Sequence, residues 1–228
     1  MEFNYTPIIL SLKVAFAAVI IVTGIAIPIA SFMARREFPG KDIVESVLTL
    51  PLVLPPSVVG FMLLVVFGKN GPIGKLLEQW FHTRVIFSIA GAIIAATVVA
   101  FPLMYQSVKA AVEGVDQDLE KAARTLGAGE IRVFFTITLP LAWNGVVAGL
   151  VLAFARSLGE FGATLMVAGN IPGKTQTMPI AIYMANEAGD TRQASILVII
   201  MTLFSFMVIY GLNHWKKGLR RESRGGGV

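Results

Sequence analysis

The sequence predicts an all-α protein that crosses a membrane about five times, because it holds that many blocks of the length a transmembrane helix needs, roughly 20 apolar residues. Of its 228 residues, 55% are hydrophobic and only 14% are charged, whereas about a quarter of the residues in soluble domains are charged. The mean hydropathy is +0.74. A long polar segment at 116–140 interrupts the apolar blocks. We expect one transmembrane domain over residues 1–228.

The first two spans differ in regularity. The first covers about Ile8–Met33. It is far longer than a signal-peptide core of about 7–15 residues, so we expect a retained span. The second covers about Val44–Phe67 and contains Pro51, Pro55 and Pro56. Proline lacks a backbone N–H and clashes with the preceding turn, so a regular helix is not expected here. Two interpretations remain: the kinked end of an ordinary span, or a bent helix that lines a pathway.

The three later spans are expected at about Val85–Val108, Leu141–Ala168 and Ala194–Leu212. A polar loop separates the second span from the third and contains Trp80. Tryptophan concentrates at the depth of the lipid headgroups. The apolar residues around Trp80 therefore indicate a short helix that lies in the membrane interface.

Two charged residues stand out inside the fourth predicted span, Arg156 and Glu160. A charge at the middle of a bilayer costs about 2.5–3.5 kcal/mol on insertion scales. Residues four apart share one face of a helix, so opposite charges there can partly neutralise one another. The pair can hold helices together, or Arg156 can add positive potential to a pathway for an anion. We favour the structural role.

The polar segment at 116–140 is predicted to fold as two short helices joined by a glycine elbow. Asp116 can cap the first helix, and Gly127 and Gly129 are expected to end it, because glycine adopts the left-handed conformation found at many helix ends. The second helix is expected at about Glu130–Thr138. Apolar residues recur at helical spacing in the first helix: Leu119, Ala122, Ala123 and Leu126. A projecting helix pair of this kind is suited to docking in a groove on a partner.

The distribution of basic residues predicts the orientation. With five alternating spans, one set of loops and the C-terminal tail hold twelve Lys and Arg residues, and the other set holds five. Cytoplasmic loops carry the excess of Lys and Arg. We therefore expect a multi-pass protein of the cell membrane with its N-terminus outside and with the C-terminus and the polar segment in the cytoplasm. The net charge of +5 then reflects these loops rather than nucleic-acid binding.

Several functions lack the residues they need. The chain has no cysteine and only two histidines, His82 and His214, so neither a catalytic residue set nor a metal site is expected. Ala168–Thr175 fits a loose phosphate-loop pattern. A true phosphate loop follows a β-strand and opens a helix, whereas this stretch follows a predicted membrane span. We expect no nucleotide site, no cofactor and no enzymatic activity in this chain.

The polar segment resembles a known family through a specific spacing, which these residues carry: Ala122, Ala123, Gly127, Ile137, Leu139 and Pro140. The spacing is similar to the cytoplasmic EAA loop of the membrane subunits of binding-protein-dependent ABC importers. In that family the loop forms coupling helices that sit in a cleft of the ATP-binding subunit. The resemblance implies ATPase coupling for these residues, together with Glu120 and Leu126. The family's glutamate directly precedes the alanines, whereas here Lys121 does and Glu120 lies one position earlier.

Further stretches resemble the molybdate branch of these permeases, and the sulfate/thiosulfate branch is close: FPGK at 38–41, LPLVLPPSVVGF at 50–61, LEKAARTLGAG at 119–129, FFTITLPL at 134–141 and FARSLGEFGAT at 154–164. The resemblance implies the fold of a type I importer permease. It also implies a second copy of the chain, two ATP-binding subunits that hold ATP and Mg²⁺, an external oxyanion-binding protein and contact with membrane lipid.

The implied function is import of molybdate or tungstate, with sulfate or thiosulfate as the alternative because these dianions share shape and charge. A secondary transporter or channel is a rival, but it usually shows internal inverted repeats, and none is visible in the sequence. A structural membrane subunit without a pathway is a second rival. Copurification with an ATPase distinguishes these possibilities.

Overall fold

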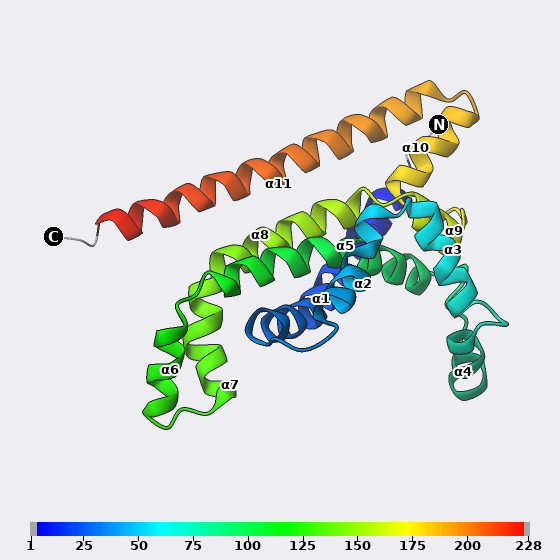
Figure 1. Ribbon diagram of the computed structural model, residues 1–228. Helices are drawn as coiled ribbons and strands as arrows, with labels where there is room; N and C mark the ends of the chain where they lie inside the picture. The colour runs from blue at the N-terminus through cyan, green and yellow to red at the C-terminus, as the bar shows by residue number, and fades with distance from the viewer. Residues whose placement is uncertain (1–3, 226–228) are drawn as a thin grey trace.

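The computed structural model describes residues 4–225, with side chains for all but Phe81 and the residues after Gly211. The described chain is helical (Figure 1), and its elements in order are α1 Thr6–Arg35, α2 Lys41–Val53, α3 Pro56–Phe67, α4 Pro72–Phe81, α5 Ile89–Glu113, α6 Gln117–Thr125, α7 Glu130–Val133, the π-helical turn η1 Phe134–Thr138, α8 Leu139–Leu158, α9 Gly162–Ala168, α10 Met178–Glu187 and α11 Thr191–Gly225. The predicted all-α class is confirmed.

The core is a bundle of α1, α5 and α8, which pack along much of their length. Small residues make this close packing possible. Buried positions of α1 recur every three or four residues: Ala15, Ala18, Val22, Ala26 and Ala30. On α8, a Cβ added at Gly149 would lie 2.7 Å from the Met104 sulfur and 3.0 Å from the Ser107 Cβ of α5. In a lipid bilayer there is no hydrophobic driving force between helices. Small residues stabilise helix pairs there by letting the backbones approach closely.

Four helices of the described chain are long and apolar enough to cross a membrane: Thr6–Arg35, Ile89–Glu113, Glu130–Leu158 and Thr191–Gly211. They agree with four of the five predicted spans in place, although their ends differ. The third predicted span begins at Ile89 rather than Val85, because the Ser88 hydroxyl caps the helix by accepting the Gly91 N–H at 3.3 Å. The bent pair α2–α3 accounts for the fifth predicted span.

The second predicted span is broken in its middle. Helices α2 and α3 meet at 115°. Leu54, at the break, has an extended backbone with φ −69° and ψ 141°, as expected for a residue that precedes a proline. Pro55 and Pro56 then start α3. The kink therefore lies in the middle of the segment, which is a bent helix rather than a span with a kinked end. Pro51, by contrast, lies inside α2.

The prediction of one continuous fourth span over Leu141–Ala168 is wrong. Helix α8 ends at Leu158, and a separate short helix, α9, begins at Gly162. The break has a local cause: the Glu160 side chain accepts the Ala163 N–H at 2.7 Å and so starts a new helix. A carboxylate in this position satisfies an otherwise unpaired N–H and favours a helix N-terminus.

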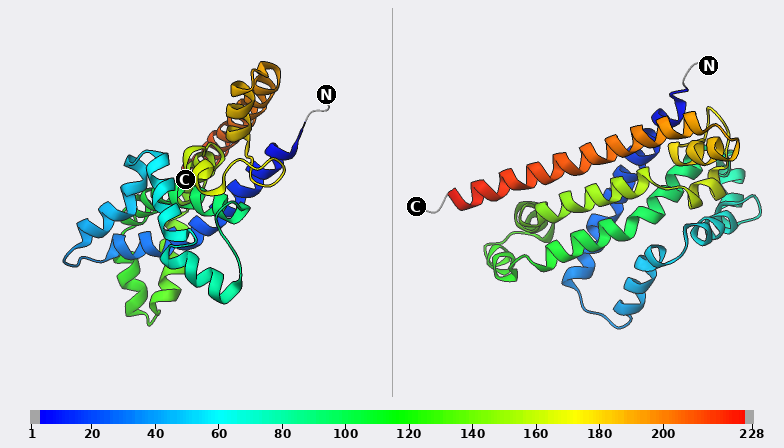
Figure 2. Two further views of the ribbon diagram at one scale, coloured as in Figure 1. Left: turned by 90° about the vertical axis from the view of Figure 1, so that its right-hand side faces the viewer. Right: turned by 90° about the horizontal axis from the view of Figure 1, so that it is seen from above.

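The two ends of the bundle carry different elements. Helices α6 and α7 project from one end, whereas α4, α9 and α10 lie at the other (Figure 1). Helix α4 exposes Ile73, Leu76 and Trp80, which share one face, as the interfacial helix predicted around Trp80 requires. Helix α11 begins beside α10 and runs along one side of the bundle (Figure 2), where the ring centroids of Phe204 and of Phe154 on α8 are 6.1 Å apart. Its apolar residues are exposed over much of the length for which side chains are described.

Candidate coupling site

The projecting segment begins with α6, and its capping is as predicted. The Asp116 side chain accepts the Asp118 N–H at 2.9 Å and caps the helix N-terminus. Gly127 has φ +86°, in the left-handed region, and ends α6 as expected. The same role predicted for Gly129 is wrong, since its φ is −70° and it caps the start of α7 instead. One residue, Gly127, therefore makes the elbow.

The second helix of the segment is not a separate piece. Helix α7 passes through the widened turn η1 directly into α8, so that residues Glu130–Leu158 form one continuous helical stretch. Pro140 follows the widened turn immediately. Because proline has no N–H and its ring clashes with the carbonyl four residues earlier, a π-helical turn before it relieves both conflicts. Any force on α7 is thus applied directly to the end of a long helix.

Helix α6 exposes apolar side chains and buries one of its two acids, Glu120. Leu126, which follows the last residue of α6, is 89% exposed. Leu119 and Ala122 are exposed on α6, and Ile131 and Phe135 are exposed beyond the elbow. Glu120, on the same short helix, is only 3% exposed. We call these five exposed apolar residues, Leu119, Ala122, Leu126, Ile131 and Phe135, together with the elbow that joins them, the tip. A soluble helix normally turns its apolar side chains toward the core, so this reversal indicates a surface that binds a partner.

The residues predicted for coupling therefore divide into two groups. Ala122, Leu126 and Gly127 lie exposed at the tip. Ala123, Ile137 and Leu139 are half-buried at its base, and Leu139 packs against the α1–α5–α8 core. Pro140 is exposed beside them. The spacing resembling the EAA loop thus joins an exposed surface to the residues that anchor it.

Glu120 is held by partners that the sequence did not reveal. Its Oε1 accepts hydrogen bonds from Arg35 Nη2 at 2.9 Å and from Thr138 Oγ1 at 2.7 Å. Arg124 Nη2 lies 3.6 Å from its Oε2. Arg35 belongs to α1 and Thr138 to η1, so the carboxylate joins elements far apart in the chain. In the sequence Arg35 was only one of many basic residues, and no local pattern linked it to Glu120.

A second ion pair closes the elbow at the surface. Arg124 on α6 donates from Nε to Glu130 Oε1 at 2.7 Å and from Nη2 to Glu130 Oε2 at 3.1 Å. A paired, planar interaction of this kind fixes orientation as well as distance. This ion pair therefore holds the two arms of the segment, α6 and α7, together across Gly127.

The predicted pair Arg156–Glu160 is present, with Arg156 Nη1 2.7 Å from Glu160 Oε2. The two residues do not lie on one helix, because Arg156 is in the last turn of α8 and Glu160 is in the break before α9. The Glu160 side chain is 1% exposed and that of Arg156 is 29% exposed. The pair therefore joins α8 to α9 at the end of a span rather than in its middle.

Residues 26–217 match a family model described as a binding-protein-dependent transport system inner membrane component. The chain belongs to this family. It is 48% identical over 222 residues to the molybdenum transport system permease protein ModB of Escherichia coli (strain K12), with 97% of both chains covered. It is 46% identical over 212 residues to the putative molybdenum transport system permease protein YvgM of Bacillus subtilis (strain 168), with 93% of both covered.

A more distant relative is the probable sulfate transport system permease protein cysT of Chlorokybus atmophyticus, 34% identical over 205 residues, which are 90% of this chain and 71% of that protein. Among solved structures, the fold is similar to a bacterial ABC transporter involved in the import of alginate, with a TM-score of 0.74, 15% identity and 95% and 80% of the two chains covered. It is also similar to the inward-facing MetNI methionine ABC transporter, with a TM-score of 0.70, 14% identity and 95% of each chain covered. The predicted importer-permease fold is thereby confirmed.

The loop of this permease that fits a phosphate-loop pattern is folded on itself. The Ile171 carbonyl accepts the backbone N–H groups of Lys174, Thr175 and Gln176 at 2.9–3.3 Å. In a phosphate loop those N–H groups point at the phosphates. The element before the loop is helix α9, not a strand. The backbone of this loop therefore differs from that of a phosphate loop.

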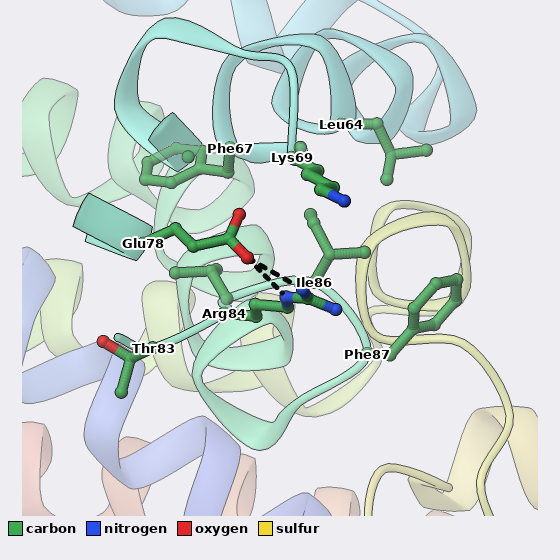
Figure 3. A pocket seen from close by; sticks show the side chains of 11 residues that line it. Leu64, Phe67, Lys69, Glu78, Thr83, Arg84, Ile86 and Phe87 are labelled. Atoms are coloured by element: carbon green, nitrogen blue, oxygen red, sulfur yellow. Dashed lines mark hydrogen bonds and ion pairs between the residues drawn. The ribbon is translucent and has the colours of Figure 1, made fainter. Parts of the chain in front are cut away.

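A cavity of about 240 Å³ lies at the end opposite the tip, between the α3–α4 connection and the segment before α5. Figure 3 shows Glu78 and Arg84 paired across it, with Arg84 Nη2 2.7 Å from Glu78 Oε1. Hydrogen bonds from Arg84 Nε and Nη2 to Glu78 Oε1 lower the pKa of the Glu78 carboxyl. The ion pair neutralises part of the positive charge that Arg84 and Lys69 bring to the cavity.

Proposed function

We propose that this permease is the transmembrane subunit of an ATP-driven importer that carries molybdate, and also tungstate, across the cell membrane. Relatives with molybdenum transport in their names share 46–48% identity with nearly the whole chain. The named sulfate permease shares 34%. This difference favours the molybdate branch over sulfate or thiosulfate.

The observation that carries the proposal is the reversed polarity of α6. The helix exposes Leu126 at its end and buries Glu120, and Ile131 extends the apolar surface beyond the elbow. Amphipathic helices that bind in grooves on partner proteins use exposed apolar anchors of this kind. The partner we propose is an ATP-binding subunit, which also holds the ATP and Mg²⁺ and performs the hydrolysis.

The orientation follows from charge. Arg35, Lys109 and Arg124 belong to the basic set of twelve residues assigned to the cytoplasm. Arg35 contacts the α6 segment, and Lys109 pairs with Glu45 at the start of α2. Their common position supports a cytoplasmic tip, a cytoplasmic C-terminus and an N-terminus outside.

The rest of the assembly is a second copy of the chain, two ATP-binding subunits and an external oxyanion-binding protein. The bent pair α2–α3 exposes large apolar side chains, among them Ile43, Val53 and Phe61. We propose that a second copy covers part of this surface and that the bent pair lines the pathway between the copies. Lipid covers the exposed face of α11.

Oxyanion competition in the reconstituted transporter tests the substrate. With the binding protein, the ATPase and radiolabelled molybdate, excess tungstate is expected to abolish uptake, because the two dianions share size and charge. Excess sulfate is expected to leave most of the uptake. Stronger competition by sulfate than by tungstate would assign the protein to the sulfate branch. Uptake without the ATPase would favour a secondary transporter or channel.

Replacement of Gly127 by valine is expected to uncouple or dissociate the ATPase. No atom lies within 4 Å of an added Cβ, so the conflict is one of backbone conformation alone. The φ of +86° costs an L-residue about 1–2 kcal/mol, and a β-branched residue more. The elbow is therefore expected to change shape and to present Leu126 and Ile131 in the wrong relation.

Two variants control this experiment. Gly127→Asn is expected to retain copurification and transport, since asparagine tolerates the left-handed conformation. Gly129→Val places the same side chain two residues away, at φ −70° and also in open space, and is expected to have little effect. ATPase copurification and molybdate uptake are the readouts. Wild-type values for Gly127→Val would show that the elbow's conformation is unimportant.

A further inference from the structure

A single guanidinium joins the end of α1 to the base of the tip. Arg35 is the last residue of α1. Its Nη2 donates to the Val115 carbonyl at 3.1 Å and to Glu120 Oε1 at 2.9 Å. Val115 lies in the short connection between α5 and α6, so the arginine holds both that connection and α6 itself.

The carboxylate of Glu120 is enclosed on its other side as well. Thr138 of η1 donates to the same oxygen at 2.7 Å. We call Arg35, Val115, Glu120 and Thr138 the α1 junction. A carboxylate that is 3% exposed must be paired, and replacing such a pair by apolar residues is often neutral or stabilising. A need for stability alone therefore does not explain why charges are used here.

Without the α1 junction, the tip would be firmly attached to the bundle only through α7 and loosely attached through α6. Its second arm continues into α8 through η1, but the first arm leaves α5 through a short connection that includes Gly114 and lacks regular structure. Such a connection can absorb a displacement of α6. The α1 junction bridges it and fixes α6 to a long helix that packs along both α5 and α8.

We propose that Arg35 is a positioning residue that makes α1 move with the tip, so that a displacement of α6 by the ATPase is passed to the transmembrane bundle. This inference rests on the proposed function, because it requires a partner that moves the tip. If Arg35 were only structural, its loss would lower assembly and leave the coupling of the assembled complexes unchanged.

Transport per ATP in the complete reconstituted transporter is the first test. Arg35→Gln complexes are expected to assemble and hydrolyse ATP, while molybdate uptake per ATP falls at least about fivefold, the lower end of typical coupling factors. Arg35→Lys is expected to restore part of the ratio. The matched control is Asp118→Asn, which removes an exposed ion pair of 2.8 Å to Lys121 on the same helix and is expected to change nothing.

A distance measurement tests the junction without any partner. The natural chain has no cysteine, so spin labels can be placed at Arg36→Cys and Lys121→Cys in the full-length permease in lipid nanodiscs. A narrow distance distribution is expected with Arg35 present, and a broad one with Arg35→Gln. Should Arg35→Gln fail to insert, Thr138→Val, which removes one hydrogen bond and keeps the ion pair, gives the same two readouts with smaller changes.

Two results overturn the inference: an unchanged uptake per ATP in the assembled variant, or an equally narrow distance distribution. Failure of the proposed function looks different, since the unmodified chain would then show no ATP-driven uptake while its distance distribution stayed narrow.

Discussion

Replacement of Leu126 by aspartate is expected to abolish binding of the ATP-binding subunit while the permease stays folded. Leu126 is 89% exposed, so little buried surface is lost within the chain. Changes at exposed positions usually alter the free energy of unfolding by less than about 0.5 kcal/mol. In a partner's groove, however, a central apolar anchor is worth at least about 2 kcal/mol, or roughly thirtyfold in affinity. A buried, unpaired carboxylate adds to this loss.

Copurification with the ATPase and the thermal stability of the lone permease separate the two effects. Leu126→Met, which keeps an apolar side chain of similar volume, is the matched control and is expected to behave as wild type. Ile131→Asp, on the other side of the elbow, is expected to reproduce the loss, because Ile131 is 77% exposed and also belongs to the tip. If ATPase binding survives both aspartate variants, the tip is not the docking surface.

Replacement of Arg156 by alanine is expected to lower the stability of the permease by about 3–5 kcal/mol, the usual cost of leaving a buried charge unpaired. Its partner Glu160 is 1% exposed and also caps α9 through the Ala163 N–H. The effect is therefore expected in the joint between α8 and α9, with lower yield in the membrane. The preference among oxyanions is expected to stay unchanged in the protein that does assemble.

A double variant tests whether the orphan charge causes this loss. Arg156→Met with Glu160→Gln removes both charges at once and is expected to be more stable than Arg156→Ala, since no orphan charge remains. The midpoint of thermal unfolding in detergent and oxyanion competition in vesicles are the two measurements. Normal stability of Arg156→Ala together with an altered oxyanion preference would place this arginine on the translocation path instead.

Much of the candidate site could be predicted from the sequence because its signals are local. Asp116 before a short amphipathic stretch predicted a capped helix, and the structure has that cap. Gly127 predicted the turn, since only glycine adopts a positive φ without cost. Local signals failed at Gly129, which begins α7 rather than ending α6. That error came from treating every glycine of the elbow as a helix end, whereas only Gly127 has the positive φ that such an end uses.

The bends of the spans were predicted unevenly for a similar reason. The prolines near residue 55 predicted the break between α2 and α3, because proline fixes φ and lacks a backbone N–H whatever surrounds it. The break between α8 and α9 was missed. It depends on Glu160, whose side chain accepts a backbone N–H three residues later. The sequence showed a charge pair at helical spacing and gave no sign that the acid would start a new helix.

The sequence by itself determined the all-α membrane class, the approximate spans, the elbow and the family resemblance, because hydropathy, helix capping and glycine conformation act over a few neighbouring residues. Only the tertiary structure decided which side of α6 faces outward and what encloses Glu120. Arg35 lies 85 residues earlier in the chain. Its contact exists because α1 packs along α5 and ends beside the α5–α6 connection, and packing between distant helices leaves no periodic trace in either segment.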